Sequence, residues 1–155
     1  MDAIFHERQR FRQKWVFGLL AFVLLPPIVV MLIDPRRPRP IGLLVASVIV
    51  TIALFWMLLA SYLDVTVTKT EIVVRYYPFH LRPRRIALSE IAEAHARKYQ
   101  PIVEYGGWGI RLGFNGWAWN VSGDEGVQLV LADGKRILIG SQRSAELERA
   151  IHSAA

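Results

Sequence analysis

The chain contains no cysteine among its 155 residues, and this absence excludes disulfide bonds, thiolate zinc sites and cysteine nucleophiles. It also lacks the G-x-S-x-G motif of serine hydrolases, and its four histidines are scattered without the spacing of metal ligands. No nucleophile–base pair and no paired carboxylates stand out elsewhere. We therefore expect no catalytic residues, no metal site and no bound cofactor, and the sequence does not indicate an enzyme.

The part of the chain that follows residue 63 lacks a strong excess of either charge. Residues 64–155 carry twelve bases and ten acids, so they contribute only +2 to the net charge of +6. Residues 1–14 and 34–40 contribute +2 each, from four bases and two acids and from three bases and one acid. Because nucleic-acid binding normally requires a basic face on the folded domain, we expect no nucleic-acid partner.

Two long stretches contain no Asp, Glu, Lys, Arg or His. Residues 15–33 form a run of 19 apolar or uncharged residues, and residues 41–63 form a run of 23. As helices they would be about 28 Å and about 35 Å long, whereas the hydrocarbon core of a membrane is roughly 30 Å thick. The sequence therefore predicts a membrane α-helical hairpin, with transmembrane helix 1 at residues 15–33, a short basic loop at residues 34–40 and transmembrane helix 2 at residues 41–63.

The bases beside these runs predict the orientation of the hairpin. Six lie on the side of the chain termini and three lie in the loop: Arg8, Arg10, Arg12, Lys14, Lys69 and Arg75 against Arg36, Arg37 and Arg39. Cytoplasmic segments of membrane proteins carry an excess of Lys and Arg. We therefore expect a multi-pass protein with both termini cytoplasmic, in which residues 1–14 form a basic cytoplasmic N-terminal segment and membrane lipids are partners.

Two features inside the runs leave alternatives open. Pro26-Pro27 predicts a kink in the first helix, which is either a bent anchor or a hinge at a functional site. The second run carries a stripe of small residues that lets another helix approach closely: Gly42, Ala46, Ala53 and Ala60. This stripe packs either on the first helix or on a second copy of the chain in a homodimer.

Residues 64–155 show the period of two that is typical of β-strands. Alternating apolar residues predict about seven short strands, and Asp133-Gly134 between the last two is a strong hairpin signal. Leu147, Ala150 and Ile151 give one apolar helical face near the C-terminus. We expect a mainly-β domain that folds independently, as a strongly bent antiparallel sheet or barrel closed by a C-terminal helix. This order of elements suits a PH-like (pleckstrin-homology-like) fold.

Short motifs in this region strengthen that expectation. The stretch RRIALSEI at residues 84–91 resembles a corner of bacterial PH-like domains. Residues 105–147, with GGWGIR, NVSG and LIGSQR, resemble a family of small uncharacterised bacterial membrane proteins with a two-span hairpin and a PH-like domain. Ser144 departs from the proline that such sequences tend to have at the helix start, although serine can cap a helix. The resemblance implies a PH-like fold and a place in the bacterial cytoplasmic (inner) membrane, but no activity.

One candidate binding surface lies where glycine and tryptophan alternate: Arg111, Asn120, Ser122, Trp108 and Trp117. Arg111 is flanked by glycines on the strand face opposite Trp108, so a phosphate or carboxylate could reach its guanidinium bidentately. Asn120 and Ser122 fall on the corresponding face of the next strand. The alternatives are an ion pair of Arg111 with Glu104 or Glu125, and tryptophans that fill the core or lie at the lipid headgroups.

A second candidate is the basic cluster of Arg82, Arg84 and Arg85, which is either a solvated edge or a contact with anionic lipid. Together these features favour a membrane-anchored PH-like interaction module. It would bind a protein segment or an anionic lipid headgroup at the inner membrane face. The alternative is an accessory subunit of a membrane enzyme or transporter complex. A membrane protein partner, or a second copy of the chain, is compatible with both hypotheses.

Overall fold

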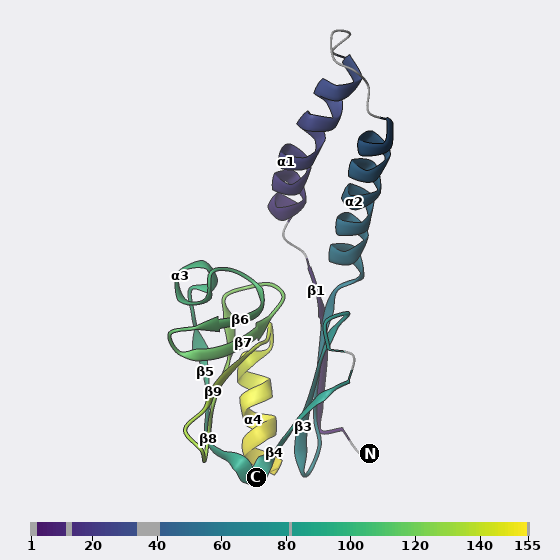
Figure 1. Cartoon of the computed structure of the whole chain (residues 1–155). Helices are drawn as coiled ribbons and strands as arrows, with labels where there is room; N and C mark the ends of the chain where they lie inside the picture. The colour runs from purple at the N-terminus through teal and green to yellow at the C-terminus, as the bar shows by residue number, and fades with distance from the viewer. Residues whose placement is uncertain (1–2, 12–13, 34–40, 81, 155) are drawn as a thin grey trace. The chain divides into compact units, whose positions relative to one another are not determined.

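The computed structural model describes residues 3–11, 14–33, 41–80 and 82–154. It divides into two compact units. Residues 12–60 form the helical unit, and residues 1–11 together with 61–155 form the β unit (Figure 1). The loop at 34–40, with its three arginines, lies outside the described residues.

The helical unit consists of α1 (Lys14–Ile33) and α2 (Ile41–Ala60), each of 20 residues. The two helices run in opposite directions, and the ring of Phe17 packs on that of Phe55 with 6.2 Å between centroids. No side chain described in either helix is buried. By length and composition α2 could cross a membrane, whereas the apolar stretch found within α1 is the shorter segment Val16–Val30.

The structure bears on the two features that left alternatives open within the helices, the Pro26-Pro27 pair and the stripe of small residues. α1 continues through Pro26 and Pro27, so it is not broken there. Gly42, Ala46 and Ala53 are exposed, and a Cβ added at Gly42 would meet open space. These three members of the stripe therefore do not pack on α1, whereas Ala60 is half-buried, and the homodimer contact stays a prediction. α2 also ends at Ala60, three residues before the predicted boundary.

Sheet A of the β unit has the strand order β1-β2-β3-β4 with antiparallel neighbours: β1 (Phe5–Arg10), β2 (Tyr62–Val67), β3 (Glu71–Tyr77) and β4 (Arg84–Ala87). Strand β1 comes from the N-terminal segment, which the sequence did not predict to be a strand. Two of its three buried positions hold Glu7 and Gln9, so it lacks the apolar alternation that marks a strand. The chain turns from sheet A into sheet B through the 3₁₀ turn η1 (Leu88–Glu90).

Sheet B has the strand order β5-β8-β9-β7-β6: β5 (Ile91–Lys98), β6 (Gly109–Gly113), β7 (Gly116–Asn120), β8 (Glu125–Leu131) and β9 (Arg136–Gly140). A short helix, α3 (Pro101–Tyr105), links β5 to β6. β7 and β9 are parallel, and a Cβ at Gly116 would collide with the carbonyl oxygen of Arg136. The prediction of one strongly bent antiparallel sheet or barrel of about seven strands is therefore wrong in detail. Among the described residues, nine strands form two separate sheets, because β4 does not pair with β5, and sheet B contains one parallel pair, β7 with β9.

The core of the β unit lies between the inner faces of the two sheets. Sheet A contributes Leu63, Val65 and Val74, and sheet B contributes Leu129 and Ile139, all fully buried. The C-terminal helix α4 (Ser144–Ala154) packs against β5 and β8 of sheet B and against β1 and β2 of sheet A.

Leu147, Ala150 and Ile151 are buried on the inner face of α4, as their spacing predicts. Ser144 is the first helical residue, and its hydroxyl donates to the Glu125 carboxylate (3.2 Å). The predicted cap is therefore replaced by a bond to sheet B.

Strand β1 is tied to the rest of the β unit by buried polar groups. The Glu7 carboxylate accepts hydrogen bonds from the Ser141 hydroxyl (2.5 Å) and from the backbone N–H of Gln142 (3.0 Å). The Gln9 amide donates to the carbonyl oxygen of Gly140 (2.7 Å). Phe5 belongs to the core. The β unit thus includes residues on both sides of the helices, and a boundary at residue 64 leaves out one edge strand.

Candidate binding pocket

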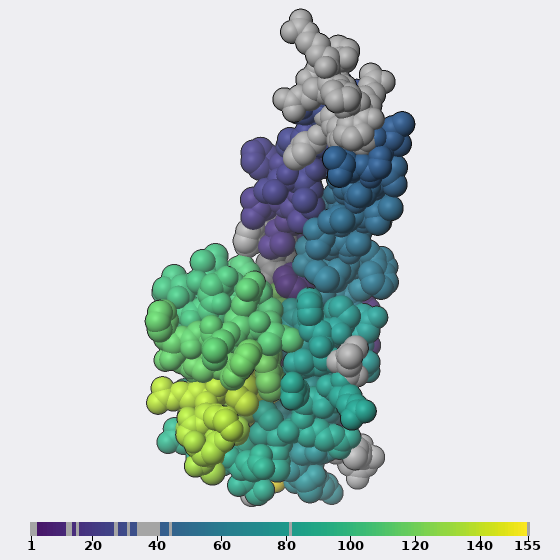
Figure 2. All heavy atoms as spheres, viewed as in Figure 1, coloured from purple at the N-terminus to yellow at the C-terminus, as the bar shows by residue number. Residues whose placement is uncertain are grey.

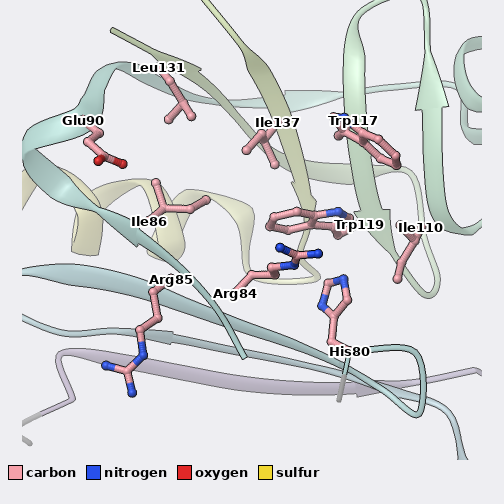
Figure 3. Close-up of a pocket in the computed structure, with 10 residues that line it drawn as sticks. All are labelled: His80, Arg84, Arg85, Ile86, Glu90, Ile110, Trp117, Trp119, Leu131 and Ile137. Atoms are coloured by element: carbon pink, nitrogen blue, oxygen red, sulfur yellow. The ribbon is translucent and has the colours of Figure 1, made fainter. Parts of the chain in front are cut away.

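A pocket of about 550 Å³ lies between the inner faces of the two sheets. α4 occupies the space over β5 and β8, whereas the inner face of β6 and β7 is left partly uncovered: Trp117 is 45% exposed and Leu112 is 67% exposed. The pocket is lined by four polar and six apolar residues (Figure 3): His80, Arg84, Arg85, Glu90, Ile86, Ile110, Trp117, Trp119, Leu131 and Ile137.

The register of β3 and β4 places Arg84 on the pocket side of sheet A. Arg84 lies opposite Val74, whose side chain is fully buried. Directly paired residues of antiparallel strands lie on the same face, so the Arg84 side chain leaves β4 on the core-facing side. Figure 3 shows its guanidinium directed toward His80 and Trp119.

The neighbouring bases of the predicted cluster point elsewhere. Arg85 leaves the opposite face of β4 and forms an ion pair with Glu71 at 2.7 Å, and its guanidinium is directed away from the pocket in Figure 3. Arg82 is exposed in the preceding turn. The predicted cluster of three lipid-facing bases is thus divided, and only Arg84 directs its charge into the pocket.

Arg84 has no carboxylate partner within residues 3–11, 14–33, 41–80 and 82–154. Glu90, the acid that lines the same pocket, lies at the other end in Figure 3. The pKa of Lys135 is raised by its salt bridge with Asp133, and the Glu90 charge contributes to the same shift. Glu90 is therefore close to another base, Lys135. The opposite end of the pocket presents the positive charge of Arg84, with which no carboxylate of the described residues pairs.

His80 lies beside Arg84 at this charged end of the pocket and is 8% exposed. The backbone N–H of Tyr76 donates to its Nδ1 (3.3 Å), so neutral His80 carries its proton on Nε2. The imidazole also meets the Trp119 ring edge-on, with 5.5 Å between centroids. Burial, and then the nearby Arg84 charge, lowers the pKa of His80. At neutral pH, Arg84 therefore supplies the positive charge and His80 supplies a neutral N–H donor.

Acidic pH is expected to destabilise the β unit through His80. The pKa of His80 is lower in the folded state than the value of about 6.5 that it has in the unfolded chain. The stabilising contribution of neutral His80 is therefore complete above about pH 6.5, and it is lost as the pH falls through the folded-state pKa. Melts of the full chain in detergent should show a Tm that falls from about pH 7.5 to about pH 5. His80→Gln should flatten this dependence, and His95→Gln, at an exposed position, should retain it. An unchanged slope in His80→Gln would contradict the assignment.

Arg111, the centre of the predicted binding surface, is exposed on the edge strand β6. Its Nε donates to the carbonyl oxygen of Trp108 (3.2 Å). The two acids considered as its partners bind other bases: Glu104 pairs with Arg97 at 2.8 Å, and Glu125 with Lys98 at 3.5 Å. The hydrogen bond from Arg97 accordingly lowers the pKa of Glu104. The alternative of an ion pair from Arg111 to Glu104 or Glu125 is therefore wrong.

The other polar members of that surface are buried. The Asn120 side chain is 0% exposed, accepts from the backbone N–H of Gly109 (2.8 Å) and donates to the Tyr99 hydroxyl (2.9 Å). Burial raises the pKa of Tyr99 to about 12, so its hydroxyl stays neutral. Ser122 is also buried and accepts from the Gln142 amide (3.0 Å). Asn120 and Ser122 therefore form no exposed surface with Arg111, because their side chains stabilise the loops around β7.

The tryptophans of the predicted surface have different surroundings. The indole N–H of Trp108 donates to the carbonyl oxygen of Gly123 (2.8 Å), which fixes the loop after β7. Trp117 is on the inner face and lines the pocket together with Trp119. Of the predicted surface, only Trp117 belongs to the pocket.

Sequence reasoning missed His80 and the apolar wall. A single histidine in a turn carries no motif, and the wall residues come from β4, β6, β7, β8 and β9. The available signal was RRIALSEI: a strand that alternates as Arg84, Ile86 places a cation on the same face as an apolar residue. No protein-family model matches the chain, and no curated protein is similar enough to it to count as a relative.

Proposed function

We propose that the chain is a membrane-anchored interaction module whose β unit binds an anionic lipid headgroup at the inner face of the bacterial cytoplasmic membrane. Arg84 is the observation that carries the proposal. It is a permanent cation on the inner face of a sheet, directed into a pocket and without a carboxylate partner in the part of the chain that the structure describes. Arginine pairs readily with phosphate and carboxylate groups through two parallel N–H donors.

The exposed surface of the helices supports the membrane anchor. Large apolar side chains such as Phe22 (76% exposed) and Ile41 (71% exposed) are uncovered along both helices. Such surfaces are unfavourable in water, at about 25 cal/mol per Å² of apolar area, and are stable in hydrocarbon. Helices of 20 residues are about 30 Å long, which matches the hydrocarbon core.

The pairing of β1 with β2 supports two spans rather than one. β1 precedes α1 and β2 follows α2, and their register runs from Phe5↔Val67 to Arg10↔Tyr62. Two strands of one sheet lie on the same side of a membrane, so the chain between them crosses it an even number of times. If α2 spans the membrane, α1 must span it as well. The charge bias around the helices then favours a cytoplasmic β unit.

The relationship to PH-like domains remains part of this proposal. RRIALSEI forms β4, η1 and the start of β5, so it makes the corner between the two sheets. The C-terminal helix covers one part of the opening between them, and the pocket occupies another. Both features fit a bent β scaffold closed by a helix.

A second candidate is an accessory subunit of a membrane enzyme or transporter complex. It is favoured by the exposed apolar tip of the β6–β7 hairpin, where Phe114 is 98% exposed beside Leu112. Apolar surface of this kind also occurs at protein interfaces. Lipid binding at Arg84 is the better supported function, because the pocket combines a positive charge with an apolar wall.

Native mass spectrometry of the full chain in detergent tests the proposal. Added phosphatidylglycerol should bind more tightly than phosphatidylcholine, and Arg84→Ala should remove this preference. A charge-assisted hydrogen bond contributes about 1.5–3 kcal/mol, so affinity should fall about tenfold or more. Arg85→Ala is the matched control, because the Arg85 guanidinium, although adjacent, is directed away from the pocket and pairs with Glu71. Equal losses in the two variants, or no loss in either, would contradict the proposal.

A further inference from the structure

We propose that the pocket encloses a hydrocarbon chain together with the anionic head. Its ligand would then be a single-chain anionic amphiphile, an alkyl phosphate or carboxylate taken from the bilayer. This inference rests on the proposed function and extends it. Headgroup recognition alone requires only Arg84 and His80, whereas the inference assigns a role to the remaining pocket wall.

The size of the pocket supports an enclosed chain. Its volume of about 550 Å³ lies within the range of roughly 300–1,000 Å³ that is typical of small-molecule sites. A phosphate or carboxylate held by Arg84 and His80 would occupy only one end of this space. The remainder extends past Ile86 toward Leu131 and Ile137 in Figure 3.

The wall of this remainder is suited to hydrocarbon. Ile86, Ile137 and Leu131 have no hydrogen-bonding groups in their side chains, so a polar ligand would lose its hydration there without compensation. A hydrocarbon chain loses no hydrogen bonds on entry and gains from leaving water. Glu90, the acid at the far end, lies near Lys135. The pKa of Lys135 is raised mainly by Asp133 and to a lesser extent by Glu90. The pocket therefore offers one site for an anion and, beside it, an apolar wall.

The route into the pocket is apolar as well. Trp117 lies at its rim, and its cross-strand neighbour Leu112 continues the apolar surface outward. The charged end is close in the chain to the membrane anchor. β2 begins at Tyr62, with only Ser61 after α2, and Tyr62 pairs with Tyr77 just before the turn that carries His80. These connections favour the bilayer as the source of the amphiphile.

A series of soluble alkyl phosphates tests the inference on the full chain in lipid nanodiscs of phosphatidylcholine. Inorganic phosphate, ethyl phosphate, butyl phosphate and hexyl phosphate are titrated by tryptophan fluorescence, with empty nanodiscs subtracted to correct for partition into lipid. Burial of each methylene should tighten binding about fourfold. Arg84→Ala should weaken all members of the series alike, and Trp117→Ala should reduce the dependence on chain length.

Phe114→Ala is the matched control, because Phe114 is a more exposed aromatic residue that does not line the pocket. Leu131→Gln serves as a second wall variant if Trp117→Ala lowers the Tm. Affinity that depends on Arg84 but not on chain length would overturn the inference and leave headgroup binding intact. No binding of any phosphate would overturn both. Chain-length dependence that survives both wall variants would show partition into lipid only, and would also overturn the inference.

Discussion

Deletion of residues 1–11 is expected to abolish cooperative folding of the β unit, although all of residues 61–155 remain. The deletion uncovers the edge of β2, removes Phe5 from the core, and leaves the Ser141 hydroxyl and the Gln142 N–H without the Glu7 carboxylate. Each buried polar group left unpaired costs about 1–3 kcal/mol, a large part of the 5–15 kcal/mol by which typical domains are stable. Limited proteolysis and hydrogen exchange of the full and shortened chains in detergent would measure the loss.

Glu7→Ala is the graded version of this deletion, with an expected loss of about 1–3 kcal/mol, because the buried Ser141 hydroxyl loses its acceptor whereas the N–H of the exposed Gln142 can bind water. Glu93→Ala, which removes an exposed carboxylate on β5, is the matched control and should change stability by about 0.5 kcal/mol or less. If residues 61–155 alone gave a cooperative melt with a full complement of exchange-protected strands, β1 would be dispensable and the domain boundary near residue 64 would be correct.

Labelling of single cysteines is expected to give an all-or-none result for topology. The chain has no native cysteine, so each introduced thiol is unique. In intact bacterial cells with a permeable outer membrane, a membrane-impermeant maleimide should label Arg37→Cys. It should not label Ala3→Cys or Ser153→Cys, which are exposed positions of the β unit. Lysis should make both accessible.

Labelling of Ala3→Cys and Ser153→Cys in intact cells, without Arg37→Cys, would reverse the orientation but preserve the hairpin. Opposite results for Ala3→Cys and Ser153→Cys would contradict the β unit itself, because Ala3 before β1 and Ser153 in α4 belong to one compact unit, which cannot lie on both sides of a membrane.

Most elements of the β unit could be predicted from the sequence, because their inward positions are apolar. The hairpin at Asp133-Gly134, the corner at RRIALSEI and the apolar face of α4 all occur at the expected places. β1 could not be predicted, since Glu7 and Gln9 occupy its inward positions and are stabilised by groups more than 130 residues away. The parallel pairing of β7 with β9 inside sheet B could not be predicted either, because β8 lies between the two strands in the chain and no local pattern encodes their register.

The site was less accessible to sequence reasoning than the fold. The alternation around Arg111 places it on the face opposite Ile110, but the pattern cannot show that Asn120 is buried and hydrogen-bonded to the Tyr99 hydroxyl. The basic cluster was a better indication, yet its three members have different surroundings. Only the register with Val74 distinguishes Arg84, which enters the pocket, from Arg85 on the outer face.

Photo-crosslinking from inside the pocket tests most directly whether the module binds an anionic lipid there. Benzoylphenylalanine in place of Trp117, in the full chain expressed in bacterial membranes, should form an adduct with the mass of an anionic lipid. Arg84→Ala should remove that adduct, and the same crosslinker at Phe114, outside the pocket lining, should not form it with comparable yield. An adduct of protein size at Trp117, or a lipid adduct that persists without Arg84, would contradict the account.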